Sequence, residues 1–224
     1  MNSSALRLTT VAAALVLLSA CSGGSDEDAA AKPSATPSAT ATPPPIDAEQ
    51  IACKLLTPED RTKLAGTAVD DIVAASGTEG SSQCRWQSTA ALIQVTTLPA
   101  KEWAKSLPDV VKQLESSSDI SSDADKKDLA DAKKLLSGAA SFTDEQACQA
   151  FVTLAELGGE AKGTTTTITA IPITQTESGL SAQTCVSGEL TSIVYSVPGL
   201  KETPEVDAAV TEVLKSAQKR VDRS

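Results

Sequence analysis

The chain contains no histidine among its 224 residues, and only 2% of its residues are aromatic. Imidazole is the base of Ser-His and Cys-His nucleophile pairs, a common zinc ligand and the side chain that titrates near neutral pH. Its absence excludes most hydrolase mechanisms and histidine-based pH switches. Because 41% of the residues are hydrophobic, the chain can still form a core. That core must be built from Ala, Val, Leu and Ile, and aromatic platforms for a ligand are scarce.

The chain also has fewer positive than negative charges, with 19 basic and 29 acidic residues and a formal net charge of -10. An excess of negative charge opposes binding to the phosphate backbone of nucleic acids. We therefore expect no nucleic-acid partner. No pattern in the chain calls for a cofactor, and we expect none.

The N-terminal segment has the features of a lipoprotein signal peptide. Arg7 precedes an apolar run over residues 8–18, and Leu18-Ser19-Ala20 leads to Cys21. This is a lipobox, in which the Cys21 thiol is acylated and residues 1–20 are removed. The stretch from Leu8 to Ala20 has 13 residues, whereas a membrane span needs about 20. We expect a lipid anchor that holds the protein at the outer face of the cytoplasmic membrane.

Residues 21–45 form a segment of low complexity that is rich in Ala, Thr and Pro and ends in three consecutive prolines. It has too little apolar surface to fold, so we expect a disordered tether. Residues 46–224 remain for one extracytoplasmic domain of ordinary size.

Within residues 46–224 we expect an α+β fold in which antiparallel hairpins pack with amphipathic helices. Thr57 and Thr203 each precede a proline and predict the start of a helix, and Thr143 predicts another because it can form a capping box with Gln146. Apolar residues at helical spacing predict a helix over 103–114, and a charged helix is expected over 123–136. Alternating and β-branched runs predict strands over 83–86 and 92–97, joined as a hairpin, and strands over 164–174, 184–187 and 190–197, with turns at Ser178-Gly179 and Gly188-Glu189.

Four cysteines remain after Cys21, whose thiol becomes the lipid thioether. Cys53, Cys84, Cys148 and Cys185 lack Cys-x-x-Cys spacing, and no histidine is present to complete a metal site. We therefore expect two disulfides and no bound metal. Of the three possible pairings, we favour Cys53 with Cys84 and Cys148 with Cys185, because each would join a helix to the next hairpin. The two units could represent pseudo-repeated halves of a duplicated chain.

A resemblance rests on Cys53-Lys54-Leu55-Leu56-Thr57-Pro58-Glu59-Asp60, followed by Gly66 and by Cys84-Arg85-Trp86. These residues resemble an uncharacterised family of actinobacterial surface lipoproteins that has a Cys-x-Leu-Leu-Thr helix and a Cys-x-Trp strand. The resemblance covers roughly residues 50–100 and implies an α+β fold with Cys53 and Cys84 bridged. In layout alone, the chain also resembles two-disulfide extracellular sensor domains of mycobacterial receptor kinases, which favours sensing or binding.

The remaining candidate residues point to binding. We interpret Trp86 and Trp103 as core residues, with the alternative that both line a ligand cleft. The threonines at 164–167 predict the exposed face of a strand, and alternatively a row of hydroxyls that faces a sugar. We expect a non-enzymatic, membrane-tethered module that binds or senses an envelope solute or protein. The alternatives are a structural or assembly protein of the envelope and a hydrolase that relies on carboxylates alone.

Overall fold

The computed structural model describes residues 47–78, 80–115, 122–174 and 177–221. The predicted signal peptide, the predicted acylation site Cys21 and the predicted tether to residue 45 lie outside these residues. The helices are α2 (Ile51–Leu55), α3 (Pro58–Ala65), α4 (Ala100–Glu115), α5 (Asp123–Leu135), the 3-10 helix η1 (Leu136–Ser141), α6 (Asp144–Leu157) and α7 (Pro204–Val221). None of these described helices is long and apolar enough to cross a membrane.

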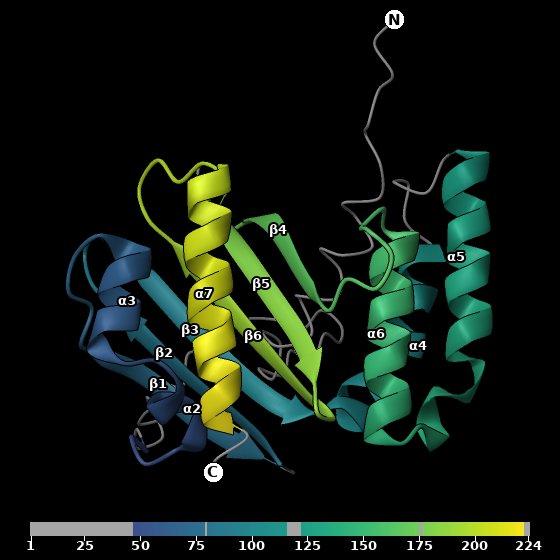
Figure 1. Ribbon diagram of the computed structural model, residues 1–224, viewed down its shortest axis with the longest axis horizontal. Helices are drawn as coiled ribbons and strands as arrows, with labels where there is room; N and C mark the ends of the chain where they lie inside the picture. The colour runs from purple at the N-terminus through teal and green to yellow at the C-terminus, as the bar shows by residue number, and fades with distance from the viewer. Residues whose placement is uncertain (1–46, 79, 116–121, 175–176, 222–224) are drawn as a thin grey trace, which may run out of the picture.

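One antiparallel sheet forms the centre of the fold, which confirms the predicted α+β class (Figure 1). Its strands are β1 (Ile72–Thr78), β2 (Ser81–Gln87), β3 (Leu92–Pro99), β4 (Thr166–Pro172), β5 (Ser178–Val186) and β6 (Glu189–Ser196). They lie in the order β1-β2-β3-β6-β5-β4. The chain thus forms two meanders of three strands each, and β3 and β6 join the meanders at the middle of the sheet.

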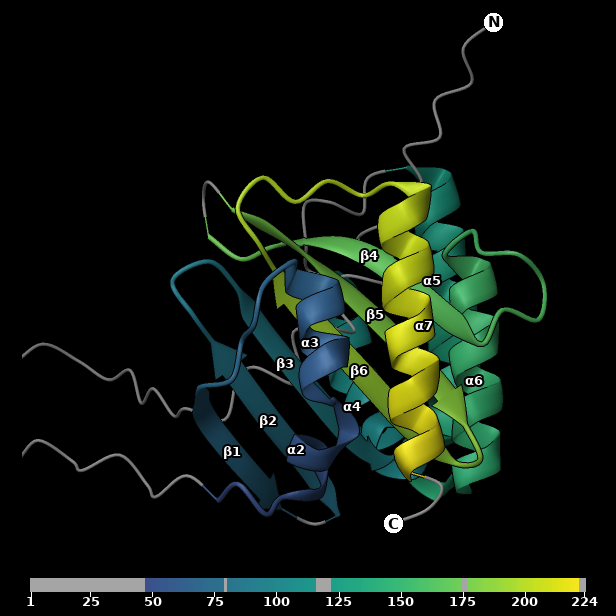
Figure 2. The same ribbon diagram turned by 60° about the vertical axis from the view of Figure 1, so that its left-hand side comes forward.

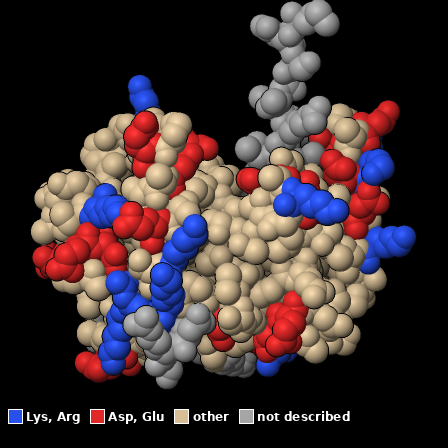
Figure 3. Space-filling model, in the orientation of Figure 1, with Lys and Arg blue, Asp and Glu red and all other residues tan. Residues whose placement is uncertain are grey.

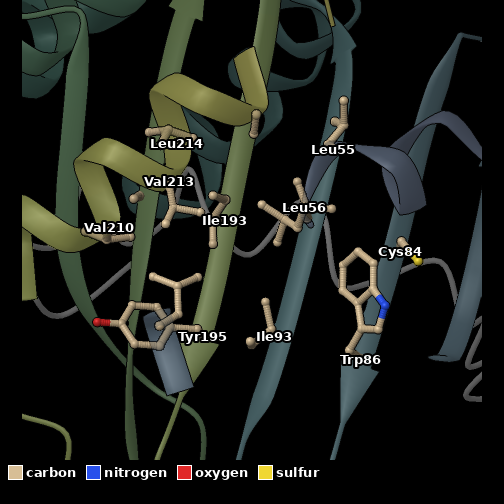
Figure 4. Packing of buried hydrophobic residues seen from close by; sticks show 14 of the residues in the cluster. Leu55, Leu56, Cys84, Trp86, Ile93, Ile193, Tyr195, Val210, Val213 and Leu214 are labelled. Carbon is tan, nitrogen blue, oxygen red and sulfur yellow. The ribbon is translucent and has the colours of Figure 1, made fainter. Parts of the chain in front are cut away.

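The two faces of the sheet carry different helices. Helices α2, α3 and α7 lie on one face, as Figures 1 and 2 show. We call this the α7 face. Its core contains Ile93, Ile193 and Tyr195 from the strands, and Val210 and Leu214 from α7. Figure 4 shows these side chains between the sheet and α7.

Helices α4, α5 and α6 form a second core at one end of the opposite face. Leu98, Leu190 and Cys185 occupy paired positions on β3, β6 and β5. Their side chains pack against a cluster that includes Trp103 and Phe151. Because strand side chains alternate between faces, these three residues point away from Ile93 and Ile193. Farther from the helices, this face carries polar side chains such as Gln94, Ser181 and Ser192, with Val194 among them.

Both predicted disulfides are present. Cys53 on α2 is bonded to Cys84 on β2, with an S–S distance of 2.10 Å, and Cys148 on α6 to Cys185 on β5, with one of 2.01 Å. In each half the first cysteine lies on a helix that precedes three strands and the second lies on the middle strand, but α3 intervenes between α2 and β1 in the first half only. The order of the cysteine-bearing elements therefore agrees in the two halves, although a duplication of the chain stays a prediction.

Two local predictions need correction. The turn expected at Ser178-Gly179 is the start of β5, where a Cβ on Gly179 would lie 2.7 Å from the carbonyl oxygen of Tyr195. The glycine therefore permits close approach of backbone within the sheet and marks no turn. The turn between β4 and β5 lies earlier, where the backbone N–H of Ile173 donates to the carbonyl oxygen of Glu177 at 2.9 Å. The turn between β5 and β6 lies at Ser187-Gly188, one residue before the expected Gly188-Glu189, and both of its residues have positive φ, as a tight hairpin requires.

Candidate functional site

The two tryptophans do not share a cleft. Trp86 is 2% exposed and lies in the core of the α7 face, next to Cys84. Trp103 is 3% exposed and lies in the other core, where its ring centroid is 5.7 Å from that of Phe151. The two tryptophan rings therefore do not line one cleft, because the sheet separates them. Both residues pack as core.

The clearest polar hollow on the α7 face lies between α7 and β4 and has a volume of about 560 Å³. We call it the α7–β4 groove. Its walls come from the α6–β4 loop, from β4, from the segment before α7 and from α7 itself. The lining residues are Glu160, Gly163, Thr164, Thr165, Thr166, Ile168, Glu202, Asp207, Thr211 and Lys215.

The lining of the groove comes from the two-residue repeat of a strand and from the four-residue spacing of a helix. Thr164, Thr166 and Ile168 are two residues apart, and the pairing of Ile168 with Ala182 places their side of β4 on the α7 face. Asp207, Thr211 and Lys215 follow one another at intervals of four residues, so they form one stripe along α7. The stripe lies beside the apolar one that carries Val210 and Leu214 into the core. A strand face and a helix face therefore line one groove with hydroxyls and charges.

The loop that carries the threonines is held firmly. The carbonyl oxygen of Thr165 accepts hydrogen bonds from the hydroxyl of Thr184, at 2.9 Å, and from the backbone N–H of Cys185, at 3.4 Å. The backbone N–H of Gly163 donates to a carboxylate oxygen of Glu156 at 2.7 Å. Gly163 has a φ of 80°, which favours glycine at this turn. This wall of the groove is therefore preformed.

Asp207 adds a partly buried carboxylate to the lining of the groove. Its Oδ1 atom is buried and has no hydrogen-bond partner among the described residues. Burial and the charge of Asp207 raise the pKa of Tyr195 to about 12, so the phenol stays neutral at ordinary pH. In Figure 4 the Tyr195 hydroxyl points toward the helix that carries Val210 and Val213. Asp207 lies in the first turn of α7, where the helix dipole favours a negative charge.

The other charges of the groove are exposed. Glu160, Glu202 and Lys215 form no ion pair within the described part of the chain. In Figure 3 the charged side chains gather mainly over the two ends of this face, and a mostly uncharged band lies between them. Three carboxylates against one ammonium make the groove negative, so it suits a ligand with hydroxyls and a positive charge.

The other hollows have less polar chemistry. One of about 530 Å³ lies between α4, α5 and η1 and is lined by Val111, Leu136 and Ala139, with the Lys133–Glu115 ion pair at its rim. Another, of about 310 Å³, lies beside the β2–β3 turn and the end of β6. No group of three or more metal-ligating side chains occurs among the described residues.

Sequence reasoning recovered only one side of the groove. The threonine run was recognised as a possible sugar contact, and residues 164–166 do line the groove. Thr167 points to the opposite face of the sheet, because it pairs with Gln183. Asp207, Thr211 and Lys215 were missed. Their spacing of four residues was the available signal, but helix spacing alone does not show which strand lies opposite.

Comparisons with known proteins found no matching family model, no matching curated protein and no matching solved structure.

Proposed function

We propose that the protein is a membrane-tethered, extracytoplasmic binding module that takes a small polyhydroxylated solute bearing an amine. Its binding site is the α7–β4 groove. The lipobox at Cys21 and the low-complexity tether support the location, and the resemblance to actinobacterial surface lipoproteins agrees with it. The observation that carries the proposal is the juxtaposition of the threonine row with the buried, unpartnered carboxylate oxygen of Asp207.

The unpartnered oxygen favours a ligand that donates hydrogen bonds. Leaving a buried acceptor without a partner costs about 1–3 kcal/mol. An ammonium or hydroxyl group of a solute would remove this cost by donating to Asp207. A charge-assisted bond of this kind is roughly twice as strong as a neutral one.

The hydroxyls and the size of the groove define the remainder of the solute. A threonine hydroxyl both donates and accepts, as does a sugar hydroxyl, so Thr164 and Thr211 can pair with a polyol in several ways. The Thr166 hydroxyl donates to that of Thr184 at 3.4 Å and can accept a hydrogen bond from the solute. The volume of about 560 Å³ lies within the range of small-molecule sites, about 300–1,000 Å³. Ile168 supplies an apolar surface for the carbon side of a ring.

Calorimetric titration of the full chain, purified in detergent, tests the proposal with D-glucosamine and N-acetyl-D-glucosamine as probes. Acetylation removes the positive charge and leaves most hydroxyls. We expect glucosamine to bind at least about tenfold more tightly, a difference of about 1.4 kcal/mol. Asp207→Asn should abolish the preference for glucosamine, and Thr166→Val should lower the affinity for both probes.

The matched control is Asp71→Asn, which removes the same charge at an exposed position outside the groove. It should leave both affinities unchanged. Equal binding of the two probes, or a preference that survives in Asp207→Asn, would contradict the proposal. So would the absence of binding by glucosamine at about 10 mM, well above a millimolar dissociation constant.

A further inference from the structure

We infer that the α7–β4 groove takes a zwitterion of about disaccharide length, an amino sugar joined to a sugar acid, with its ammonium at Asp207 and its carboxylate at Lys215. The second charge and the length of the solute go beyond the function proposed above, on which this inference rests. The arrangement of charge along α7 gives the first evidence.

Asp207 and Lys215 carry opposite charges on one wall of the groove, and both residues line it. They are eight residues apart on α7, which corresponds to about 12 Å along the axis of a helix. Thr211 lies between them and places a hydroxyl at the middle of this wall. A solute that follows the wall therefore meets a carboxylate, a hydroxyl and an ammonium in that order.

The strand register shows which part of β4 faces each charge. At one end of the groove, Tyr195 on β6 is paired with Leu180 on β5, and Leu180 is paired with Ala170 on β4. Burial and the charge of Asp207 raise the pKa of Tyr195, so Asp207 lies near this row of paired residues. The Ala170 end of β4 is therefore level with the start of α7.

The start of β4 is level with the other end of α7. Thr166 on β4 is paired with Thr184 on β5, and Thr184 is paired with Thr191 on β6. The hydroxyl of Thr191 donates to the side-chain oxygen of Gln218 at 2.7 Å. Figure 1 shows the same arrangement, since α7 and β5 run in the same direction. Lys215 therefore shares its end of the groove with the start of β4.

The strand wall has about the same length as the helix wall. Thr164 and Ile168 are four residues apart, which corresponds to about 13 Å along an extended chain. The apolar side chain of Ile168 lies toward the Asp207 end, and the Thr164 hydroxyl lies toward Lys215. A single hexose ring covers only part of this length, whereas a disaccharide covers most of it.

The Lys215 end suits a carboxylate. A solute that fills the groove covers the exposed Lys215 ammonium, and a covered charge is costly unless it is paired. A carboxylate pairs with the ammonium and can accept a hydrogen bond from the Thr164 hydroxyl. Glu160 lines the groove just before the threonines, and its charge offsets part of that of Lys215. A carboxylate of charge -1 therefore fits this end better than a phosphate, which carries about -1.5 to -2 at neutral pH.

The same charges set the direction in which the solute binds. Glu202 lies just before α7, at the Asp207 end of the groove. Both carboxylates attract an ammonium, and Lys215 repels one at the opposite end. The solute therefore binds with its amino sugar toward Asp207 and its sugar acid toward Lys215.

Two disaccharides that differ in one group test the inference by calorimetric titration of the full chain in detergent. Glucuronosyl-glucosamine and glucosyl-glucosamine, each linked as in cellobiose, differ only in that a carboxylate of the first replaces a hydroxymethyl group of the second. We expect glucuronosyl-glucosamine to bind at least about threefold more tightly, as for an exposed ion pair. Lys215→Met keeps the apolar stem and removes the charge. It should abolish this difference without weakening the binding of D-glucosamine.

Lys219→Met is the matched control, because Lys219 is an exposed lysine on α7 that does not line the groove. It should leave the difference between the two disaccharides intact. Asp207→Asn should weaken both disaccharides by a similar factor, since both carry the amine.

The outcomes separate this inference from the function proposed above. The inference alone is overturned if D-glucosamine shows its expected preference over N-acetyl-D-glucosamine but the two disaccharides bind equally. A difference between the disaccharides that persists in Lys215→Met also overturns it. The proposed function fails, and the inference with it, if neither D-glucosamine nor either disaccharide binds at about 10 mM.

Discussion

The guanidinium of Arg61 lies 4.9 Å from the centre of the Trp86 ring. Arg61 is 7% exposed, and it also donates to the carbonyl oxygens of Val69 and Leu56, at 2.6 and 2.9 Å. A carboxylate oxygen of Asp70 lies 2.7 Å away. One side chain thus joins α3, the segment before β1 and the core strand β2. The cation–π contact and the carbonyl hydrogen bonds compensate for burying the charge.

Replacing Arg61 should therefore destabilise the fold. We expect Arg61→Ala to lower the free energy of unfolding by about 3 kcal/mol, because two carbonyl groups and the Trp86 ring lose their partner. Urea denaturation followed by circular dichroism measures the change. The control Lys63→Ala removes an exposed ion pair with Glu212 and should cost less than about 1 kcal/mol. Equal effects of the two substitutions would show that the buried contacts contribute little.

The second prediction concerns the disulfide between α6 and β5. It closes a loop with a sequence separation of 37, and loss of loop-closure entropy in the unfolded chain then stabilises the fold by about 4 kcal/mol. Replacing both Cys148 and Cys185 by alanine should lower the free energy of unfolding by about that amount. The same urea experiment measures it, and non-reducing peptide mass spectrometry verifies the pairing in the wild type. A linked peptide that joins the two halves would refute this connectivity.

A third prediction concerns the pH dependence of stability. The backbone N–H of Lys101 donates to Asp144 at 3.0 Å, and this bond, helped by the Lys101 ammonium at 3.3 Å, lowers the pKa of Asp144 below 3.8. A carboxylate with a lowered pKa stabilises the fold fully above its unfolded value and loses this contribution as pH falls through the folded value. Asp144→Asn should therefore cost about 1 kcal/mol at pH 7.

Urea denaturation of wild type and Asp144→Asn between pH 2 and pH 7, a range set by the ordinary carboxyl pKa of about 4, measures this difference. The two proteins should converge at the acid end, where Asp144 is protonated. A difference in the free energy of unfolding that stays constant over the whole pH range would mean that the charge of Asp144 does not cause the difference.

The fourth prediction concerns the anchor. Because the lipobox ends at Cys21, Cys21→Ala should leave the protein without lipid and with its signal peptide uncleaved. Labelling cells with radioactive palmitate should mark the wild-type chain and not the variant. Label in the Cys21→Ala protein would show that palmitate is attached to another residue, which contradicts the prediction.

The sequence predicted the local features of the fold well. Thr143 and Gln146 form the expected capping box, with the side-chain oxygen of Gln146 2.9 Å from the backbone N–H of Thr143. The capping box depends on residues close in the chain, so propensity and spacing are sufficient to find it. The disulfide pairing was also predicted, because each bridge stays within one unit of a helix and the strands that follow it.

Two kinds of feature were missed. β1 pairs with the next strand in the chain, but it is an edge strand whose Val73 is 43% exposed, so it lacks the alternation that identifies a buried strand. The row of paired residues that runs across the sheet from Arg85 to Ser181 exists only through the pairing of β3 with β6. Sequence reasoning about each hairpin alone could not establish that central register. Helix spacing likewise could not show that α7 lies opposite β4, so the α7 side of the groove was not predicted.

The most direct test of the central claim, that the α7–β4 groove is the binding site, is a titration of the isotope-labelled full chain with D-glucosamine, followed by NMR. We predict that backbone amide shifts change most for residues 163–168 and 207–215, the two walls of the groove. The Asp207→Asn chain should show these changes only weakly. Shifts concentrated elsewhere on the protein, or no shifts at a saturating concentration, would contradict the account.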